Sequence, residues 1–121
     1  MIKYSKFILI LTLIFGLSSC SEYRKVLKTE GYEKKLEAAM KYYEDEEYFK
    51  ASTLFKDIKP LVKGSEESET VDFYFAYSLY NLKQYSLSSK YFKGFIELFS
   101  RSDKVTAVSY THLTLPTTSS V

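Results

Sequence analysis

The chain contains few side chains of the types that catalyse reactions, since cysteine and histidine occur once each, at Cys20 and His112. A single cysteine cannot form an internal disulfide bond. A Cys/His pair or a Ser/His/Asp triad also needs an imidazole, and His112 lies in a C-terminal segment whose composition differs from the rest. Gly94 lies within a helical pattern and belongs to no phosphate-binding loop. We therefore expect neither enzymatic activity nor a cofactor.

An acidic run is the cluster that could bind a hard cation, and it comprises Glu66, Glu67, Glu69 and Asp72. Calcium-binding loops need a regular spacing of ligands and a glycine at the turn, and the run has neither. Acidic runs of this kind are more often the solvated face of a helix. We expect no metal site here.

The N-terminus has the three parts of a secretory signal peptide, which we assign to residues 1–19. Lys3 and Lys6 supply the positive start, and residues 7–17 (FILILTLIFGL) form an uncharged apolar core of 11 residues. This core is shorter than the roughly 20 apolar residues of a membrane-spanning helix. A buried core helix or strand is the alternative, but the leading lysines and the abrupt change to small residues argue against it.

The end of this segment, Leu17-Ser18-Ser19-Cys20, resembles the lipobox of bacterial lipoproteins. In that family the cysteine thiol is diacylated, the signal is cut just before it, and the new amine is usually acylated too. Small side chains let the peptidase approach the backbone, and only a thiol forms the thioether. Acyl chains contribute ~0.8 kcal/mol per buried CH₂, so two or three of them anchor a protein firmly. The alternative is an ordinary signal peptide with a chance cysteine at its end.

Residues 20–31 are then expected to be the lipidated cysteine and a polar tether. Ser21 follows the cysteine, which resembles lipoproteins that are sorted to the outer membrane. Arg24, Lys25 and Lys28 could contact lipid headgroups or could be solvated parts of the tether, and we favour the tether.

The overall charge gives no support for a nucleic-acid partner. The formal net charge is +2, but Lys3 and Lys6 lie in the predicted signal. Their removal leaves 15 basic and 15 acidic side chains, so the mature chain is neutral. Nucleic-acid-binding domains are usually basic, and we expect neither a nucleic-acid partner nor an acidic substrate.

Apolar residues recur three and four positions apart from Tyr32 onwards, which predicts helices and not strands. Leu36, Ala39, Met40 and Tyr43 form one such stripe. The breaks in the pattern predict four helices, at about residues 32–44, 48–62, 66–82 and 85–99. Ser65 is the expected N-cap of the third helix, and Pro60 should disturb the last turn of the second. The expected fold class is all-α.

The predicted helices form two hairpins, over residues 32–63 and 66–100, that match at a spacing of 37 residues. The pattern resembles the tetratricopeptide repeat, whose period is about 34 residues, although the glycine usual beside the small alanine is missing. Such hairpins stack into an α-solenoid whose concave face binds a peptide or another protein, and two repeats alone bury little surface. The matching positions expected to pack the helices together are Ala39, Tyr48, Ala51 and Phe55 in the first repeat and Ala76, Tyr85, Ser88 and Phe92 in the second.

Tyrosine is frequent, with 12 residues, and several lie on the first helix of each hairpin. Aromatic rings offer a large contact area at low entropic cost, so some of them could line a peptide groove. Packing of repeat against repeat is the alternative that we favour for most of these rings. The groove candidates are Tyr42, Tyr43, Tyr77 and Tyr80, with Tyr74 as a further member.

The C-terminal segment differs from everything before it. Residues 100–106 look like a loop leading to another helix, but residues 108–117 (VSYTHLTLPT) are uncharged and β-branched. A natural C-terminal strand is one interpretation, although the chain offers no partner strand. The segment also resembles the translation of a transposase-type sequencing adapter (GTC TCT TAT ACA CAT CTG ACG CTG CCG ACG). We favour that interpretation, which makes residues 107–121 non-native and removes His112 from any functional hypothesis.

The order of these features resembles the BamD family of outer-membrane β-barrel assembly lipoproteins in the form found in Bacteroidetes-type bacteria. The resemblance rests on a lipobox, then SEYRKVLK, then hairpins containing YFKA and YFKGF, and it covers residues 1–106. It implies an α-solenoid anchored through Cys20 on the periplasmic face of the outer membrane. It also implies two partners, the precursors of outer-membrane barrels and the barrel-forming assembly protein. In that family the N-terminal repeats are linked to precursor binding, and later repeats contact the assembly machine.

Two other functions fit the same sequence features. One is a substrate-binding lipoprotein of the nutrient-uptake type, which also combines a lipobox with tetratricopeptide helices and carries a long glycan-binding insertion. The other is a small lipoprotein adaptor for an unidentified partner. We expect the assembly function because the chain follows the order of that family's motifs.

Overall fold

The computed structural model describes residues 2–116, and for residues 2 and 15–19 it describes the backbone alone. The chain divides into two compact units between Gly31 and Tyr32. The described residues form α-helices joined by turns, with no β-strand among them. The predicted all-α fold class is therefore confirmed.

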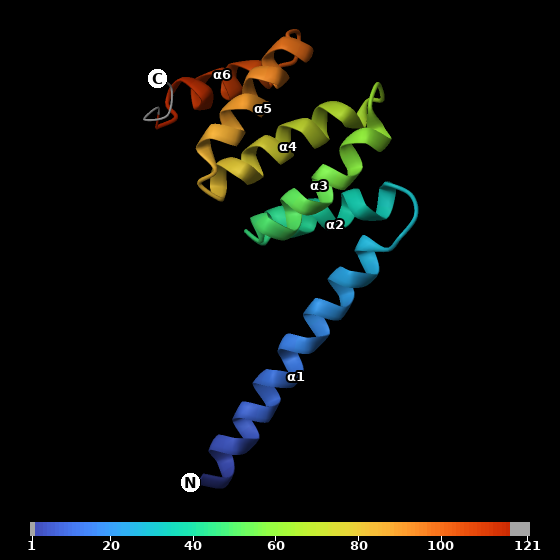
Figure 1. Ribbon diagram of the computed structural model, residues 1–121, viewed down its shortest axis with the longest axis vertical. Helices are drawn as coiled ribbons and strands as arrows, with labels where there is room; N and C mark the ends of the chain where they lie inside the picture. The colour runs from blue at the N-terminus through green and yellow to red at the C-terminus, as the bar shows by residue number, and fades with distance from the viewer. Residues whose placement is uncertain (1, 117–121) are drawn as a thin grey trace. The chain divides into compact units, whose positions relative to one another are not determined.

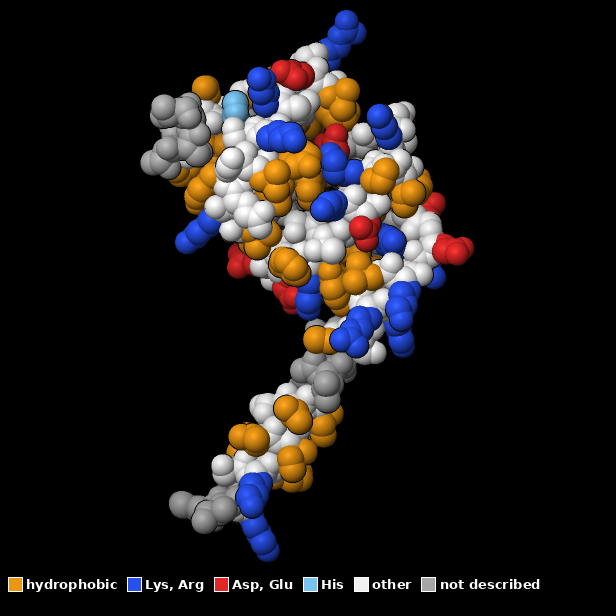
Figure 2. All heavy atoms as spheres, viewed as in Figure 1, with side chains coloured by type: hydrophobic (Ala, Val, Ile, Leu, Met, Phe, Trp, Pro, Cys, Tyr) orange, Lys and Arg blue, Asp and Glu red, His pale blue; other side chains and the backbone are white. Residues whose placement is uncertain are grey.

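The first unit contains one helix, α1 (Ile2–Leu27), which passes through Cys20 without interruption (Figure 1). Most of the expected tether is therefore helical, up to Leu27. Hydrophobic side chains project to solvent along the first half of α1, and Phe7 and Leu13 are each 67% exposed (Figure 2). Among the residues described, no helix combines the length and the apolar character needed to cross a membrane.

The second unit is a stack of helices in which each helix packs mainly against the next one in the sequence, and α2 also contacts α4 (Figure 1). The helices are α2 (Glu33–Glu44), α3 (Tyr48–Val62), α4 (Glu67–Asn81), α5 (Tyr85–Leu98) and α6 (Val105–Leu113). The bounds of α2 to α5 agree with the predicted helices to within one residue at each end. Packing between sequential neighbours is typical of helical-repeat proteins, and the unit is built from helical hairpins.

The turns inside the two hairpins have the same backbone geometry. Glu46 and Lys83, 37 residues apart, have φ of 61° and 62°, and the residues that follow them, Glu47 and Gln84, have φ and ψ within 2° of each other. Both turns are Schellman motifs, in which two N–H groups beyond the helix end donate to carbonyls of its last turn. The bonds are Glu46 to Tyr43 and Glu47 to Tyr42 in the first turn, and Lys83 to Tyr80 and Gln84 to Leu79 in the second, at 2.8–3.1 Å. The 37-residue match therefore extends to the backbone.

The connection between the hairpins differs from the sequence prediction at Ser65. The expected N-cap is wrong, because α4 begins at Glu67 and has no side-chain cap. The Ser65 hydroxyl instead donates to the carbonyl of Val62, at the end of α3, over 2.6 Å. Gly64 makes the turn possible with φ of 85°, a value that glycine adopts without steric cost. Pro60 lies in the last turn of α3, as predicted, and the helix continues to Val62.

As far as residue 116, the C-terminal segment forms one helix, α6, between turns on either side. Helix α6 covers much of the segment in which a strand was one interpretation, so that interpretation is wrong. Val108 is fully buried and joins Phe92 and Phe95 in one apolar cluster, because α6 packs on α5. The adapter interpretation depends on the codons and stays a prediction, and residues 117–121 of that segment lie outside the described residues.

Candidate functional site

Cys20 lies exposed on α1 beside a group of basic side chains. Together with Ser21, Arg24, Lys25 and Lys28, it lines a shallow hollow of about 380 Å³. The spacing explains this arrangement, because residues four and eight positions after Cys20 lie on the same face of a helix. A thiol on this face is accessible for acylation, and the cations beside it could contact the phosphates of lipid headgroups. Lipidation of Cys20 stays a prediction.

The small residues predicted to pack the two hairpins are buried in both of them. Ala39 and Ala76 have no exposed surface, nor have Ala51 and Ser88 at the next matching position. The Ser88 hydroxyl is satisfied locally, since it donates to the carbonyl of Tyr85 over 3.1 Å. Small side chains at these positions allow adjacent helices to approach closely, which a larger residue would prevent.

The aromatic residues at the matching positions also play the same part in each hairpin. Phe55 and Phe92 are completely buried. The ring of Tyr48 meets that of Tyr43 edge-on at 5.3 Å, and the matching rings of Tyr85 and Tyr80 meet edge-on at 5.8 Å. Aromatic pairs favour this edge-to-face geometry, which adds about 0.5–1.5 kcal/mol to the burial of the rings. These contacts fix each second helix against the end of its first.

The tyrosines considered for a peptide groove make contacts mainly with other rings. The Tyr43 and Tyr74 centroids are 4.9 Å apart, which joins α2 to α4 and therefore the first repeat to the second. Tyr77 meets Phe92 at 4.9 Å, and Tyr80 meets it at 6.3 Å. These contacts support packing as the role of the rings, although each of these tyrosines remains partly exposed.

Tyr42 has a different environment from the tyrosines of the repeat interface. The ammonium of Lys50 lies 5.2 Å from the centre of its ring, within range of a cation–π contact. Tyr77 also reaches α6, where its hydroxyl lies 2.8 Å from the Thr111 hydroxyl. A role for Tyr42, Tyr43, Tyr77 and Tyr80 in peptide binding stays a prediction.

Tyr43 is the tyrosine whose titration is most affected by packing. Burial raises the pKa of Tyr43 to about 12, with smaller contributions in the same direction from Tyr48 and Tyr74. A phenolate at this position would lose hydration and lie beside other phenol oxygens, so the folded chain favours the neutral form. We therefore expect alkaline pH to weaken the interface between the repeats.

The acidic run does not converge on a common point. Asp72 binds Lys59, whereas Glu69 accepts a hydrogen bond from the Ser102 hydroxyl and lies 3.7 Å from the Lys104 ammonium. The pKa of the Glu67 carboxyl lies below its usual value, mainly because the carboxylate accepts a hydrogen bond from the Glu67 backbone N–H. Within residues 2–116, no three metal-ligating side chains gather in a group.

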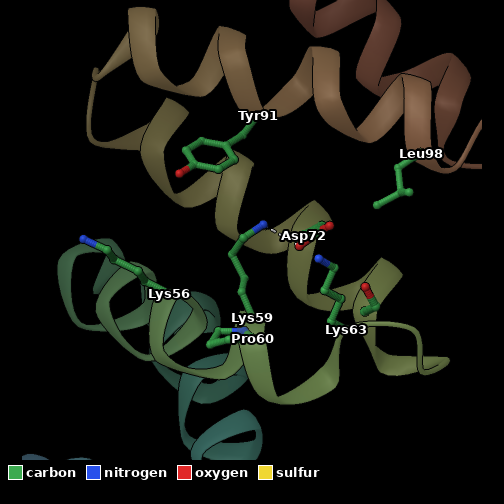
Figure 3. A pocket seen from close by; sticks show the side chains of 8 residues that line it. Lys56, Lys59, Pro60, Lys63, Asp72, Tyr91 and Leu98 are labelled. Carbon is green, nitrogen blue, oxygen red and sulfur yellow. Dashed lines mark hydrogen bonds and ion pairs between the residues drawn. The ribbon is translucent and has the colours of Figure 1, made fainter.

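A second hollow, of about 410 Å³, opens between α3, α4 and α5, and the sequence analysis did not identify it. We name it the lysine hollow after Lys56 and Lys59 of α3 and Lys63, the residue that follows the helix (Figure 3). The spacing of three residues places Lys56 and Lys59 on one face of the helix. The other residues that line the hollow are Pro60 of α3, Ser68 and Asp72 of α4, and Tyr91 and Leu98 of α5 (Figure 3). The spacing of the lysines was visible in the sequence, but the approach of α5 was not.

Comparison with known protein families and with curated proteins identified no relative of this chain. No sequence profile of a known protein family matches the chain, and no curated protein is significantly similar to it. The part of the chain that the structure describes has three candidate functional surfaces, which are the exposed face of Cys20, the aromatic interface between the repeats and the lysine hollow.

Proposed function

We propose that this protein is a lipid-anchored scaffold of the outer-membrane β-barrel assembly machinery, which binds precursor and partner proteins through its helical repeats. The observation that carries the proposal is the combination, in one chain, of an accessible Cys20 flanked by basic side chains and stacked tetratricopeptide-like hairpins. Acylation would fix the chain to a membrane, and stacked hairpins bind extended segments of other proteins. The order of motifs, which resembles the BamD family, favours barrel precursors and the barrel-forming assembly protein as the partners.

In this proposal the protein acts by binding and not by catalysis. The acyl chains of Cys20 hold it at the periplasmic face of the outer membrane, where newly exported precursors arrive. Two hairpins form a rigid surface because their aromatic rings interlock between α2, α4 and α5. A rigid repeat surface binds a partner without a large ordering cost of its own.

Depletion of the protein from the bacterium that encodes it tests the proposal. The heat-modifiable, folded forms of outer-membrane barrels should fall, and unfolded precursors should accumulate in the periplasm. A plasmid copy of the whole gene should restore the folded forms, whereas the same copy with Cys20→Ser should restore them less well. Unchanged barrel levels together with impaired growth on a glycan would contradict the proposal and favour nutrient uptake.

A further inference from the structure

The lysine hollow carries a positive charge that the surrounding residues do not neutralise. Lys56, Lys59 and Lys63 contribute three cations, and Asp72 is the carboxylate that lines the hollow with them. Lys59 and Asp72 form an ion pair of 2.6 Å, which Figure 3 shows at the wall of the hollow. Within the described part of the chain, Lys56 and Lys63 take part in no ion pair, so the hollow offers two free cations.

The central lysine is held in place by more than its carboxylate. The Lys59 ammonium lies 5.3 Å from the centre of the Phe75 ring and 5.0 Å from that of Tyr91. Contacts with α4 and α5 therefore fix this cation, and only 26% of its side chain is exposed. A fixed cation between two free ones gives a site with a defined charge pattern, which diffuse surface lysines do not have.

The second repeat shows that the hairpin fold does not require a lysine at the position of Lys59 or of Lys63. The residues 37 positions after Lys59 and Lys63 are Ile96 and Ser100. The turns, the small residues and the buried phenylalanines match between the repeats, and Lys56 matches Lys93, but the other two cations of this face have no counterpart. The second hairpin has no cation at the position of Lys63, and Lys63 takes part in no ion pair within the described residues, so its presence is more readily explained by a ligand than by stability.

Apolar surface lies next to the cations. Leu98 is 67% exposed although it lines the hollow, and Pro60 and the ring of Tyr91 add further apolar atoms. An exposed leucine and an aromatic ring beside lysines resemble the centre of a protein interface, where apolar anchors are combined with a few charges. A volume of about 410 Å³ accommodates a few side chains and not a folded domain.

We propose that the lysine hollow binds an extended segment of another protein in which acidic side chains alternate with apolar ones. The acidic groups would bind Lys56 and Lys63, and an apolar side chain would cover Leu98. A membrane surface is a poorer fit, because a flat bilayer contacts protruding charges, whereas Lys59 is recessed and the site is concave. The inference deepens the proposed function, on which it rests, because a scaffold needs a surface for its clients.

Fluorescence anisotropy with the full chain in a nonionic detergent tests this inference. The probe is a labelled peptide in which two glutamates alternate with a phenylalanine and a leucine. The double variant Lys56→Glu, Lys63→Glu should weaken binding by about tenfold or more, because it reverses both free charges. The matched control Lys34→Glu, Lys41→Glu makes the same charge change on exposed residues of α2 and should leave affinity within about twofold.

Further probes separate the site from general attraction. A peptide with lysines in place of the glutamates, and one with alanines in place of the phenylalanine and leucine, should both bind poorly. Equal losses in the two double variants, or equal binding of the alanine peptide, would overturn the inference. Vesicles of anionic phospholipid that displace the peptide through Lys56 and Lys63 would also overturn it, in favour of a membrane surface. Peptide binding in vitro and barrel levels in cells can fail separately, so each proposal can be rejected alone.

Discussion

The two hairpins of this chain share several features that packing requires and differ at one charged surface. Their turns, their small buried residues and their buried phenylalanines match at a spacing of 37 residues. The surface that carries Lys56, Lys59 and Lys63 has no full counterpart in the second hairpin. The shared positions are those that pack a hairpin. Lys59 and Lys63, which the second hairpin lacks, mark the surface at which we propose that the first hairpin binds a ligand.

The largest expected effect tests whether the buried rings of Phe55 and Phe92 contribute equally to the free energy of unfolding. Phe55→Ala and Phe92→Ala should each lower the free energy of unfolding by about 3–5 kcal/mol, because each deletes a fully buried ring and leaves a cavity. Urea unfolding followed by circular dichroism measures the loss, and Phe→Leu variants rank the two sites if the alanine variants do not fold. Phe49→Ala, at a site that is 68% exposed, serves as the control and should change little. A large loss at only one of the two rings would contradict the equivalence.

The next largest effect on stability is expected from the ion pair between Lys59 and Asp72, whose lysine the second hairpin lacks. Lys59→Ile installs the residue found at the matching position of the second hairpin and leaves Asp72 without its partner. We expect a loss of about 1–2 kcal/mol in the free energy of unfolding, because the pair is partly buried but still reached by water. The exposed Lys56→Ile should cost less than about 0.5 kcal/mol. In a double-mutant cycle, Lys59→Ile with Asp72→Asn should lose less than the sum of the single variants, and strict additivity would show that the ion pair contributes nothing.

Alkaline pH should weaken the interface between the repeats through Tyr43. The pKa of Tyr43 is about 12 in the folded chain and near 10 when unfolded, so only the folded form keeps this proton between those values. The contribution of Tyr43 to the free energy of unfolding therefore does not vary with pH below 10, and it falls as the pH rises towards 12. The loss should be on the order of 1 kcal/mol, since water reaches part of the ring. Urea unfolding of the Tyr43→Phe variant should show a shallower decline over this range, and an unchanged decline would contradict the assignment.

The smallest effect tests the shared turn geometry. Glu46 and Lys83 both adopt positive φ, which costs a residue with a Cβ roughly 1 kcal/mol and costs glycine little. Glu46→Gly and Lys83→Gly should each raise the free energy of unfolding by about 0.5–1 kcal/mol. Thermal unfolding would detect the gain, and Gly64→Ala, at φ of 85°, should lower stability in the same assay. A gain at one turn and a loss at the other would show that the turns are not equivalent.

The sequence predicted the repeat fold well because its signals are local. Apolar spacing located α2 to α5, and the match of Ala39 with Ala76 and of Phe55 with Phe92 identified residues that are buried. Ser65 was assigned wrongly because its hydroxyl has two possible backbone partners, and only the path of the turn decides between them. The positive φ of Glu46 and Lys83 carries no glycine signal, so the Schellman motifs could not be predicted.

The candidate site was less predictable because it depends on contacts between helices. Lys56 and Lys59 share a face of α3 that the sequence spacing predicts, and Lys63 follows directly after the helix. Their meeting with Tyr91 and Leu98 depends on how α5 packs across α4, which no local pattern specifies. Cys20 is the opposite case, since the lipobox-like residues before it indicate acylation without any structural information.

Metabolic labelling with radioactive palmitate tests the central claim most directly, namely that Cys20 anchors a helical-repeat scaffold to a membrane. The full chain produced in a bacterium with lipoprotein-processing enzymes should incorporate the label and sediment with the membrane fraction. Cys20→Ser should abolish incorporation, whereas Ser21→Ala, next to it, should retain it. The absence of label from the wild-type chain, or equal labelling of the Cys20→Ser variant, would contradict the account.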